Sequence, residues 1–134
     1  METFVYVLGV AIGLLSLGWV LVGIFSMWEA KRRAGEVLRA VLTQEQCCQL
    51  VQRGYLDIPS PSDPERIYRV PQAPGFVQVR ERGRVKMKLC LQPLEWIPDA
   101  DIVVIHKLMI EADEQTYLQK ANVIGPVWDS YDIR

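Results

Sequence analysis

The chain has 134 residues, with 15 basic and 16 acidic side chains and a formal net charge of −1. This length allows one domain, and a net charge so close to zero implies no polyanionic partner, which disfavours nucleic acid as a partner. The cysteines are Cys47, Cys48 and Cys90. Because their number is odd and two are adjacent, they do not indicate a disulfide framework, and free thiols fit a reducing compartment.

The first predicted element is an uncharged stretch, Phe4–Met27, which we call the apolar segment. Its length of about 24 residues exceeds a hydrocarbon core of about 30 Å at about 1.5 Å per residue. Only Met1, Glu2 and Thr3 precede it, so the positive region of a cleaved signal peptide is missing. We therefore expect a retained transmembrane anchor over residues 1–28. A buried core helix is the alternative, but the remaining chain is too small to surround it.

The residues beside the apolar segment predict its orientation. Lys31, Arg32 and Arg33 follow the segment, whereas the preceding flank carries Glu2 and no Lys or Arg. Basic residues are retained on the cytoplasmic side of membrane helices. We therefore expect a single-pass membrane protein with its N-terminus outside and its C-terminal domain in the cytoplasm.

Small residues recur on one side of the apolar segment. Gly9 and Gly13 form a G-x-x-x-G pair, and Ser16 continues roughly the same face. Such a face lets a second helix approach closely, although glycine is common in membrane helices and the pair also arises by chance. We expect helix packing there, with a second copy of the chain or with another membrane-protein subunit.

Helical patterns continue after the anchor. Residues 29–42 carry apolar side chains at helical spacing and predict a juxtamembrane helix that extends the span. Thr43 and Gln46 then form a capping-box pattern, and Gly54 can end the second helix in a left-handed conformation. This helix opens the small α+β domain that we predict over residues 43–122.

Extended segments follow at residues 55–58 and 67–70, and a β-hairpin is predicted at 76–91. In the hairpin, odd positions are apolar and even positions are polar or basic, so one face is core and the other cationic. A three-residue loop at 81–83 would pair Val79 with Val85 and Arg80 with Arg84, and would place Gly83 in a left-handed conformation.

The C-terminal third is less regular. Residues 102–110 are compatible with a buried strand or a helix, and both remain open. Residues 113–121 favour a helix with Asp113 as its N-cap. The tail, 123–134, is expected to be irregular, with Pro126, Trp128 and Tyr131 docked onto a surface. The predicted fold class is therefore α+β, with a single N-terminal transmembrane helix followed by a small domain of short helices and an antiparallel sheet.

Several sequence blocks carry a resemblance. The blocks GYLDIPSP, RIYRVP, LCLQP and PDADIVVIHKLMIEADEQTYLQKAN occur in this order over about residues 42–122. Over this range the chain resembles a family of small uncharacterised bacterial proteins. The resemblance implies one folding unit and no particular activity.

The strongest candidates for a metal or catalytic site are Cys48, Cys90 and His106, because thiolates and imidazole are ligands that zinc prefers. No CxxC or HxxxH pair accompanies them, and adjacent cysteines on a helix point apart. We therefore expect buried thiols and a satisfied histidine, without a metal or other cofactor. The chain also lacks GxSxG, Walker and GxGxxG motifs, which favours a role other than catalysis.

Basic residues form the second candidate site. The predicted basic surface consists of Lys31, Arg32, Arg33, Arg80, Arg84, Lys86 and Lys88. In a membrane-anchored domain, each could contribute about 1 kcal/mol by attraction to anionic headgroups. The surface could equally meet an acidic subunit or a nucleic acid, although a sheet face without exposed aromatic residues is a poor platform for single strands. A solvated strand face is the remaining explanation.

These patterns together predict a membrane-anchored interaction protein, an accessory or scaffolding subunit of a membrane complex. The alternative function is a membrane-tethered metal- or thiol-dependent enzyme that uses Cys48, Cys90 and His106.

Overall fold

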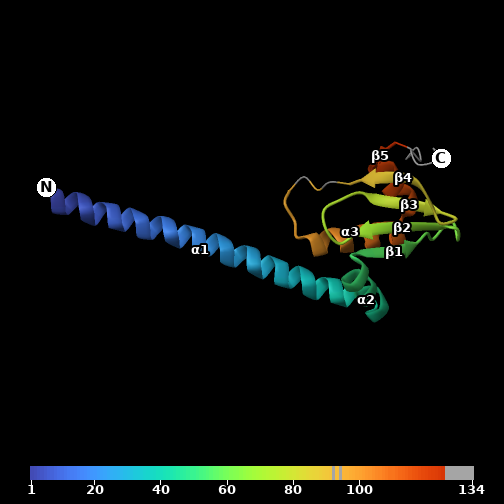
Figure 1. The fold of residues 1–134 in the computed structure, drawn as a ribbon, viewed down its shortest axis with the longest axis horizontal. Coiled ribbons are helices and arrows are strands. Elements are labelled where there is room, and N and C mark those ends of the chain that lie inside the picture. Colours follow the sequence, from blue (N-terminus) through green and yellow to red (C-terminus); the bar gives the residue numbers. More distant parts are fainter. Residues whose placement is uncertain (92, 94, 126–134) are drawn as a thin grey trace, which may run out of the picture. The chain divides into compact units, whose positions relative to one another are not determined.

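The computed structural model describes residues 1–91, 93 and 95–125. In chain order, the elements are α1 (Glu2–Val41), α2 (Gln44–Arg53), β1 (Tyr55–Pro59), β2 (Arg66–Pro71), β3 (Val77–Glu81), β4 (Arg84–Cys90), α3 (Asp99–Ala112), α4 (Glu114–Lys120) and β5 (Asn122–Ile124) (Figure 1). The chain divides into two compact units, residues 1–33 and residues 34–134. We call the second unit the α+β domain.

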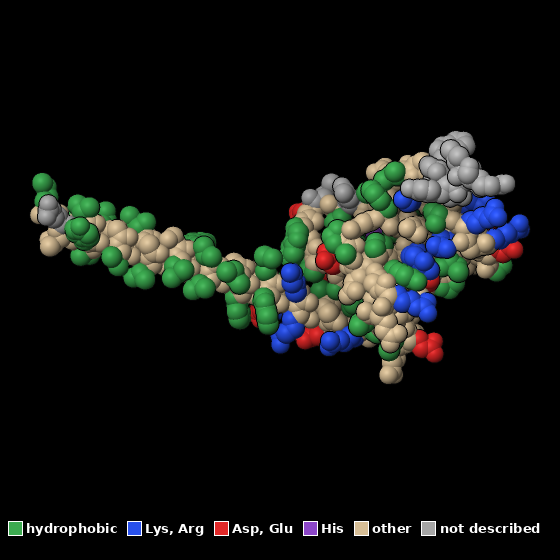
Figure 2. All heavy atoms as spheres, viewed as in Figure 1, with side chains coloured by type: hydrophobic (Ala, Val, Ile, Leu, Met, Phe, Trp, Pro, Cys, Tyr) green, Lys and Arg blue, Asp and Glu red, His purple; other side chains and the backbone are tan. Residues whose placement is uncertain are grey.

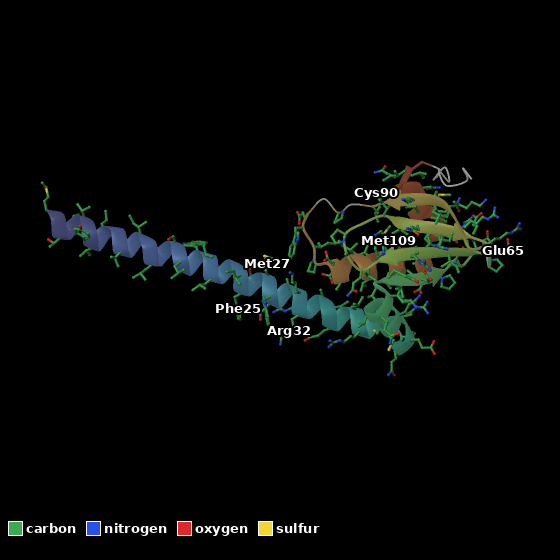
Figure 3. The ribbon with its side chains drawn as sticks, in the orientation of Figure 1. Phe25, Met27, Arg32, Glu65, Cys90 and Met109 are labelled. Carbon is green, nitrogen blue, oxygen red and sulfur yellow. The ribbon has the colours of Figure 1, made fainter. Side chains whose placement is uncertain are left out.

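The first unit consists of helical residues of α1 and contains the apolar segment. This helix is long and apolar enough to cross a membrane, and none of its most apolar window is buried within the chain. Its large hydrophobic side chains are exposed, and Figure 2 shows many of them along the visible face of the helix. Phe25 and Met27 project from the helix, and Arg32 follows just over a turn later (Figure 3). A buried core helix does not describe this segment. The helix expected over residues 29–42 is confirmed as the last part of α1, which ends at Val41.

The α+β domain is built on a five-stranded antiparallel sheet with the strand order β1-β2-β3-β4-β5. Helices α3 and α4 cover one face of this sheet, and α2 packs against β1 (Figure 1). Alternate strand residues point to this covered face, as the period of two requires. The fully buried side chains of the core include Leu50, Leu56, Ile58, Tyr68, Val70, Val77, Val79, Leu89, Val103, Ile110 and Tyr117.

Local sequence signals account for α2. The Thr43 side chain accepts a hydrogen bond from the backbone N–H of Gln46, and the Gln46 side chain accepts one from the backbone of Thr43. At the other end, Gly54 has a φ of 74° and donates to the carbonyl of Leu50. The predicted capping box and left-handed C-cap are both confirmed.

Residues 102–110, for which strand and helix were both open, lie in α3. Asp99 and Asp101 occupy its first turn, where carboxylates interact favourably with the helix dipole. Val103, His106 and Ile110 are buried along one side, as the helical period predicts. The following helix, α4, begins after Asp113, whose side chain accepts from the backbone N–H of Thr116. The predicted N-cap is therefore confirmed.

The β3–β4 hairpin differs from its prediction. Its turn has two residues, Arg82 and Gly83, with φ values of 51° and 79°. This turn pairs Arg80 with Val85 and Glu81 with Arg84, so the expected Val79–Val85 and Arg80–Arg84 pairs are wrong.

A β-bulge reconciles this short turn with the core. The register shifts between Val79 and Arg80, and beyond the shift Val79 pairs with Met87. The extra residue on β4 is Lys86, and it returns the apolar side chains to the covered face. Two-residue turns with positive φ match the twist of paired strands, which explains why the hairpin combines such a turn with a bulge.

The sheet also gains a strand that the sequence did not predict. Residues 122–124 form β5 and pair with β4, although an irregular tail was expected from residue 123. A segment of three residues is too short for an alternating pattern to reveal it. Pro126, Trp128 and Tyr131, for which a docked tail was predicted, lie outside the described residues.

Candidate functional site

The predicted helix-packing residues all lie on α1. A Cβ atom added at Gly9 or Gly13 would meet nothing within 4 Å. The Ser16 hydroxyl donates to the carbonyl of Gly13 at 2.9 Å, so its polar group is satisfied within the helix. Among the described residues, packing of the chain itself therefore does not require small side chains at these positions.

The predicted basic surface is only partly assembled. Lys31, Arg32 and Arg33 are exposed on α1. In the sheet, Arg80 and Lys88 lie on the face opposite the core, because they alternate with buried Val79 and Leu89.

The other two predicted strand residues lie differently. Lys86 is exposed at the bulge, and Arg84 pairs with Glu81, so the register separates Arg84 from Arg80. The predicted cationic face therefore loses Arg84. In the α+β domain, Lys and Arg side chains gather over the strands in Figure 2.

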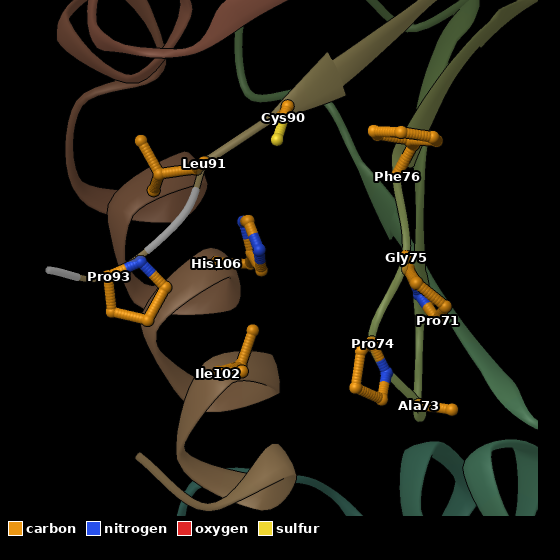
Figure 4. A pocket seen from close by; sticks show the side chains of 10 residues that line it. All are labelled: Pro71, Ala73, Pro74, Gly75, Phe76, Cys90, Leu91, Pro93, Ile102 and His106. Carbon is orange, nitrogen blue, oxygen red and sulfur yellow. The ribbon is translucent and has the colours of Figure 1, made fainter. Parts of the chain in front are cut away.

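The three metal or thiol candidates are also separated. Cys90, at the end of β4, and His106, on α3, line the same pocket (Figure 4). Cys48 is exposed on α2 and lines a different hollow with Thr43 and Glu45. The part of the chain that the structure describes holds no group of three or more His, Cys, Asp or Glu side chains able to bind a metal. Two of the three candidates, Cys90 and His106, thus line one pocket, and Cys48 lies elsewhere.

We call this cavity the His106 pocket; its volume is about 560 Å³. One wall comes from the end of β2, with Pro71, and from the loop between β2 and β3, with Pro74 and Phe76. The facing wall is formed by α3, where Ile102 and His106 are one helical turn apart and so share a face. The end of β4 contributes Cys90, Leu91 and Pro93.

The imidazole of His106 is only 4% exposed. Its Nδ1 lies 2.9 Å from the hydroxyl oxygen of Tyr117, at hydrogen-bond distance. Burial lowers the pKa of His106 to about 4, because the imidazolium would lose its hydration. Burial also raises the pKa of Tyr117. At neutral pH the pair is therefore an uncharged imidazole beside a protonated hydroxyl.

A second buried site, which the sequence did not reveal, surrounds Glu114 at the start of α4. This carboxylate is 7% exposed. It accepts hydrogen bonds from the hydroxyl of Ser60 at 2.7 Å and from the backbone N–H and hydroxyl of Ser62 at 3.2 and 2.5 Å. The Tyr68 hydroxyl and the Arg66 guanidinium also donate to it, the latter at 3.3 Å. We call these five residues the Glu114 cluster.

Electrostatics fix the charge of the Glu114 cluster. Burial alone would raise the pKa of Glu114, but the hydrogen bonds from Ser62, Tyr68, Ser60 and Arg66 outweigh it and lower the pKa to about 2. Arg66 also bonds to Glu81 at 3.1 Å, so the guanidinium joins two carboxylates. This carboxylate is ionised and surrounded by donors, which indicates a structural role rather than a group free to exchange protons.

Aromatic rings connect the two sites. The rings of Tyr68 and Tyr117 meet edge to face at 5.9 Å, and those of Tyr117 and His106 at 5.8 Å. Both distances and the near-perpendicular planes are typical of favourable aromatic pairs. The Glu114 cluster and the His106 pocket are therefore two ends of one buried row of side chains.

Sequence separation explains why these contacts were missed. Ser60 and Glu114 lie 54 positions apart, and His106 and Tyr117 lie 11 apart on two different helices. No local spacing rule relates such residues, because their contact depends on how α3 and α4 pack on the sheet. The only usable signal was chemical type, which marked Cys90 and His106.

The fold and site thus define an α+β protein with a long apolar N-terminal helix and one pocketed domain. No protein-family model matches the chain, and no curated protein or solved structure is significantly similar to it. The resemblance of residues 42–122 to small bacterial proteins stays a proposal.

Proposed function

We propose that this chain is a single-pass membrane protein that acts as an accessory or scaffolding subunit of a membrane complex. The apolar segment crosses the bilayer, and the α+β domain lies in the cytoplasm. The observation that carries this proposal is an uncharged helix of spanning length with no buried residue in its most apolar window. In water such a surface would be strongly unfavourable, since each Å² of exposed apolar area costs about 25 cal/mol.

The charges beside the segment support the orientation. Lys31, Arg32 and Arg33 are exposed on α1 directly after the segment. Exposed basic side chains there favour retention of that end in the cytoplasm. The outward Arg80 and Lys88 of the sheet would add attraction to an anionic surface.

Cysteine labelling tests membrane crossing and orientation together. We expect the full chain to stay in the membrane fraction after alkaline extraction. In intact cells, an impermeant maleimide should label Thr3→Cys in a Cys47→Ser, Cys48→Ser, Cys90→Ser background. The exposed Cys48 of the native chain should be labelled only after permeabilisation. Labelling of Cys48 in intact cells, or release of the chain by alkali, would refute the topology.

The subunit role depends on the small-residue face of α1. Gly9 and Gly13 offer space where a partner helix could approach, and a larger side chain there meets nothing within the chain. Gly18 has equally open surroundings but lies about 140° around the helix from Gly13. The two positions therefore form a matched pair.

Mild-detergent purification with chemical crosslinking tests this face. We expect the native chain to crosslink to a second membrane helix, from another copy or another subunit. Gly13→Leu should abolish this product, whereas Gly18→Leu should leave it intact. Recovery of an uncrosslinked monomer, or equal effects of the two substitutions, would contradict the subunit role.

A membrane-tethered thiol- or metal-dependent enzyme is the second candidate, favoured by the shared pocket of Cys90 and His106. Metal analysis of the purified full chain distinguishes it from the scaffold. Stoichiometric metal that is lost in Cys90→Ser but kept in Cys48→Ser would favour the enzyme. Absence of metal from all three proteins would reject its metal-dependent form.

A further inference from the structure

The lining of the His106 pocket selects the kind of molecule that it can hold. Among the residues that the structure describes, the lining contains no Asp, Glu, Lys or Arg. A charged ligand would lose its hydration there without gaining a counter-charge, which is strongly unfavourable. The volume of about 560 Å³ lies within the range typical of small-molecule sites. The pocket therefore suits an uncharged and largely apolar molecule.

His106 supplies a polar group inside this apolar lining. In Figure 4 its imidazole projects from α3 into the space between Cys90, Ile102 and the β2–β3 loop. Among the described residues, the ring has one recorded hydrogen bond, between Nδ1 and the hydroxyl of Tyr117. No buried side-chain nitrogen or oxygen of the described residues lacks a partner. Because His106 lines the pocket and its ring is directed into it (Figure 4), Nε2, the ring nitrogen without a partner among the described residues, is placed at the pocket.

The partner of Nδ1 decides which nitrogen carries the proton. The Tyr117 hydroxyl is protonated, and within the described residues its recorded hydrogen bond is to His106 alone. If Nδ1 carried the proton, the O–H of Tyr117 would be left without an acceptor in the core, at a cost of about 1–3 kcal/mol. Tyr117 therefore donates to Nδ1, and Nε2–H becomes a donor directed at the pocket.

We infer that the His106 pocket binds a small, uncharged, mostly apolar molecule with a carbonyl-type acceptor, which receives a hydrogen bond from Nε2–H of His106. Phe76 and Ile102 contact the apolar part from opposite walls, and the thiol of Cys90 contributes a soft, polarisable surface beside it. This inference does not depend on the proposed membrane role. It concerns only residues of the α+β domain.

The chain has one histidine, so ¹⁵N-histidine labelling of the full chain in detergent micelles gives the imidazole signals of His106 alone. The probes are two neutral ketones, acetophenone and cyclohexanone. Ethylbenzene and methylcyclohexane are the matched hydrocarbons without an acceptor. We expect saturable changes in the Nε2 shift with the ketones. The hydrocarbons should bind about tenfold more weakly, the factor that one hydrogen bond can supply.

Two tryptophan variants separate the pocket from unspecific partitioning. Ile102→Trp fills the pocket from α3, whereas Ile105→Trp adds the same ring at an exposed position of the same helix outside the lining. We expect Ile102→Trp to lose the saturable response and Ile105→Trp to keep it, both with native circular dichroism. Failure of both ketones to give a saturable shift, or an equal response in the two variants, would overturn the inference. Equal affinities for ketones and hydrocarbons would overturn the donor role of His106.

Discussion

The Glu114 cluster and the His106 pocket lie at the two ends of one row of buried aromatic side chains, yet they differ in how many hydrogen bonds their polar groups make. Glu114 receives hydrogen bonds from Ser60, Ser62, Arg66 and Tyr68. Among the described residues, His106 has one hydrogen-bond partner, Tyr117, and it lines a cavity. The donors around Glu114 already satisfy its carboxylate, whereas His106 presents a donor to an open space.

The contrast teaches that burial alone does not identify a functional residue. Both side chains are almost fully buried, and both have strongly shifted pKa values, to about 2 for Glu114 and about 4 for His106. The pKa of the carboxylate is lowered by donors that satisfy its charge, whereas that of the imidazole is lowered by loss of water. Only the second situation leaves hydrogen-bonding capacity available. The predictions below test this difference.

The largest effect is expected for Glu114→Ala. The substitution removes the shared acceptor of two serines, a tyrosine and Arg66, and leaves the buried hydroxyls of Ser60 and Tyr68 without their charged acceptor. We expect a loss of about 3–5 kcal/mol in unfolding free energy. Urea unfolding of the full chain in micelles, followed by the near-ultraviolet signal of the buried tyrosines, measures this loss.

The exposed neighbour Gln115 provides the control, since Gln115→Ala should change stability by less than about 0.5 kcal/mol. A loss below about 1 kcal/mol for Glu114→Ala would mean that the cluster is not structural.

Tyr68→Phe removes a single donor from the same carboxylate. Hydrogen bonds to charged groups contribute about 1.5–3 kcal/mol, so we expect a loss within this range. Tyr55→Phe is the matched control: its ring lies under the Arg69 guanidinium at 3.8 Å, and this contact does not need the hydroxyl. Equal losses in the two variants would show that the Glu114 charge gives the Tyr68 bond no added strength.

The pH dependence of stability separates the two sites without mutation. The pKa of His106 is about 4 in the folded chain, whereas the ordinary value for a histidine exposed to water is 6.5. As the pH falls, the histidine therefore takes up its proton in the unfolded state before it does so in the folded state. The contribution of His106 to stability is complete above about pH 6.5 and is lost as the pH approaches 4. From about pH 7 to pH 5, we expect a loss of about 2 kcal/mol from this group.

Glu114 affects stability in a lower pH range. Its contribution to the unfolding free energy is lost only as the pH falls from 4.5 towards about 2. His106→Phe should therefore remove most of the change between pH 7 and pH 5 and leave the more acidic transition. Titration of the single histidine by ¹⁵N shifts checks the cause directly. A folded-state pKa near 6.5 would contradict a desolvated imidazole.

Features that depend on neighbouring residues could be predicted from the sequence. The caps of α2 join Thr43 to Gln46 and Gly54 to Leu50, so the pattern contains all the partners. The apolar segment was equally readable, because composition and length define it. The hairpin turn could not be predicted in this way. Strict alternation of apolar and polar residues excludes a two-residue turn, but the bulge at Lys86 makes its register possible.

The candidate site was predictable only in part. Cys90 and His106 stood out by chemical type, but as metal ligands, whereas the structure places them in an apolar pocket. The Glu114 cluster gave no sequence signal, because Ser60 and Glu114 approach each other only after α4 packs onto the sheet. Long-range packing, which no local pattern encodes, therefore decides which polar residues become satisfied and which face a cavity.

The smallest effect is expected for Tyr117→Phe, which removes the hydroxyl at the uncharged end of the aromatic row. Its bond to Nδ1 of His106 joins two neutral groups, so we expect a loss of about 1 kcal/mol, clearly smaller than for Tyr68→Phe. The packing of the rings should persist, because benzene and phenol edges pack alike.

The histidine spectrum of Tyr117→Phe then tests the basis of the comparison. Without the hydroxyl that donates to Nδ1, the imidazole loses the contact that keeps the proton on Nε2. We expect the ¹⁵N shifts of the two ring nitrogens to converge as both tautomers become populated, and ketone affinity to fall with the share of Nε2–H. Unchanged shifts would show that Tyr117 does not set the proton position. In that case, the difference between the two sites would rest on the cavity alone.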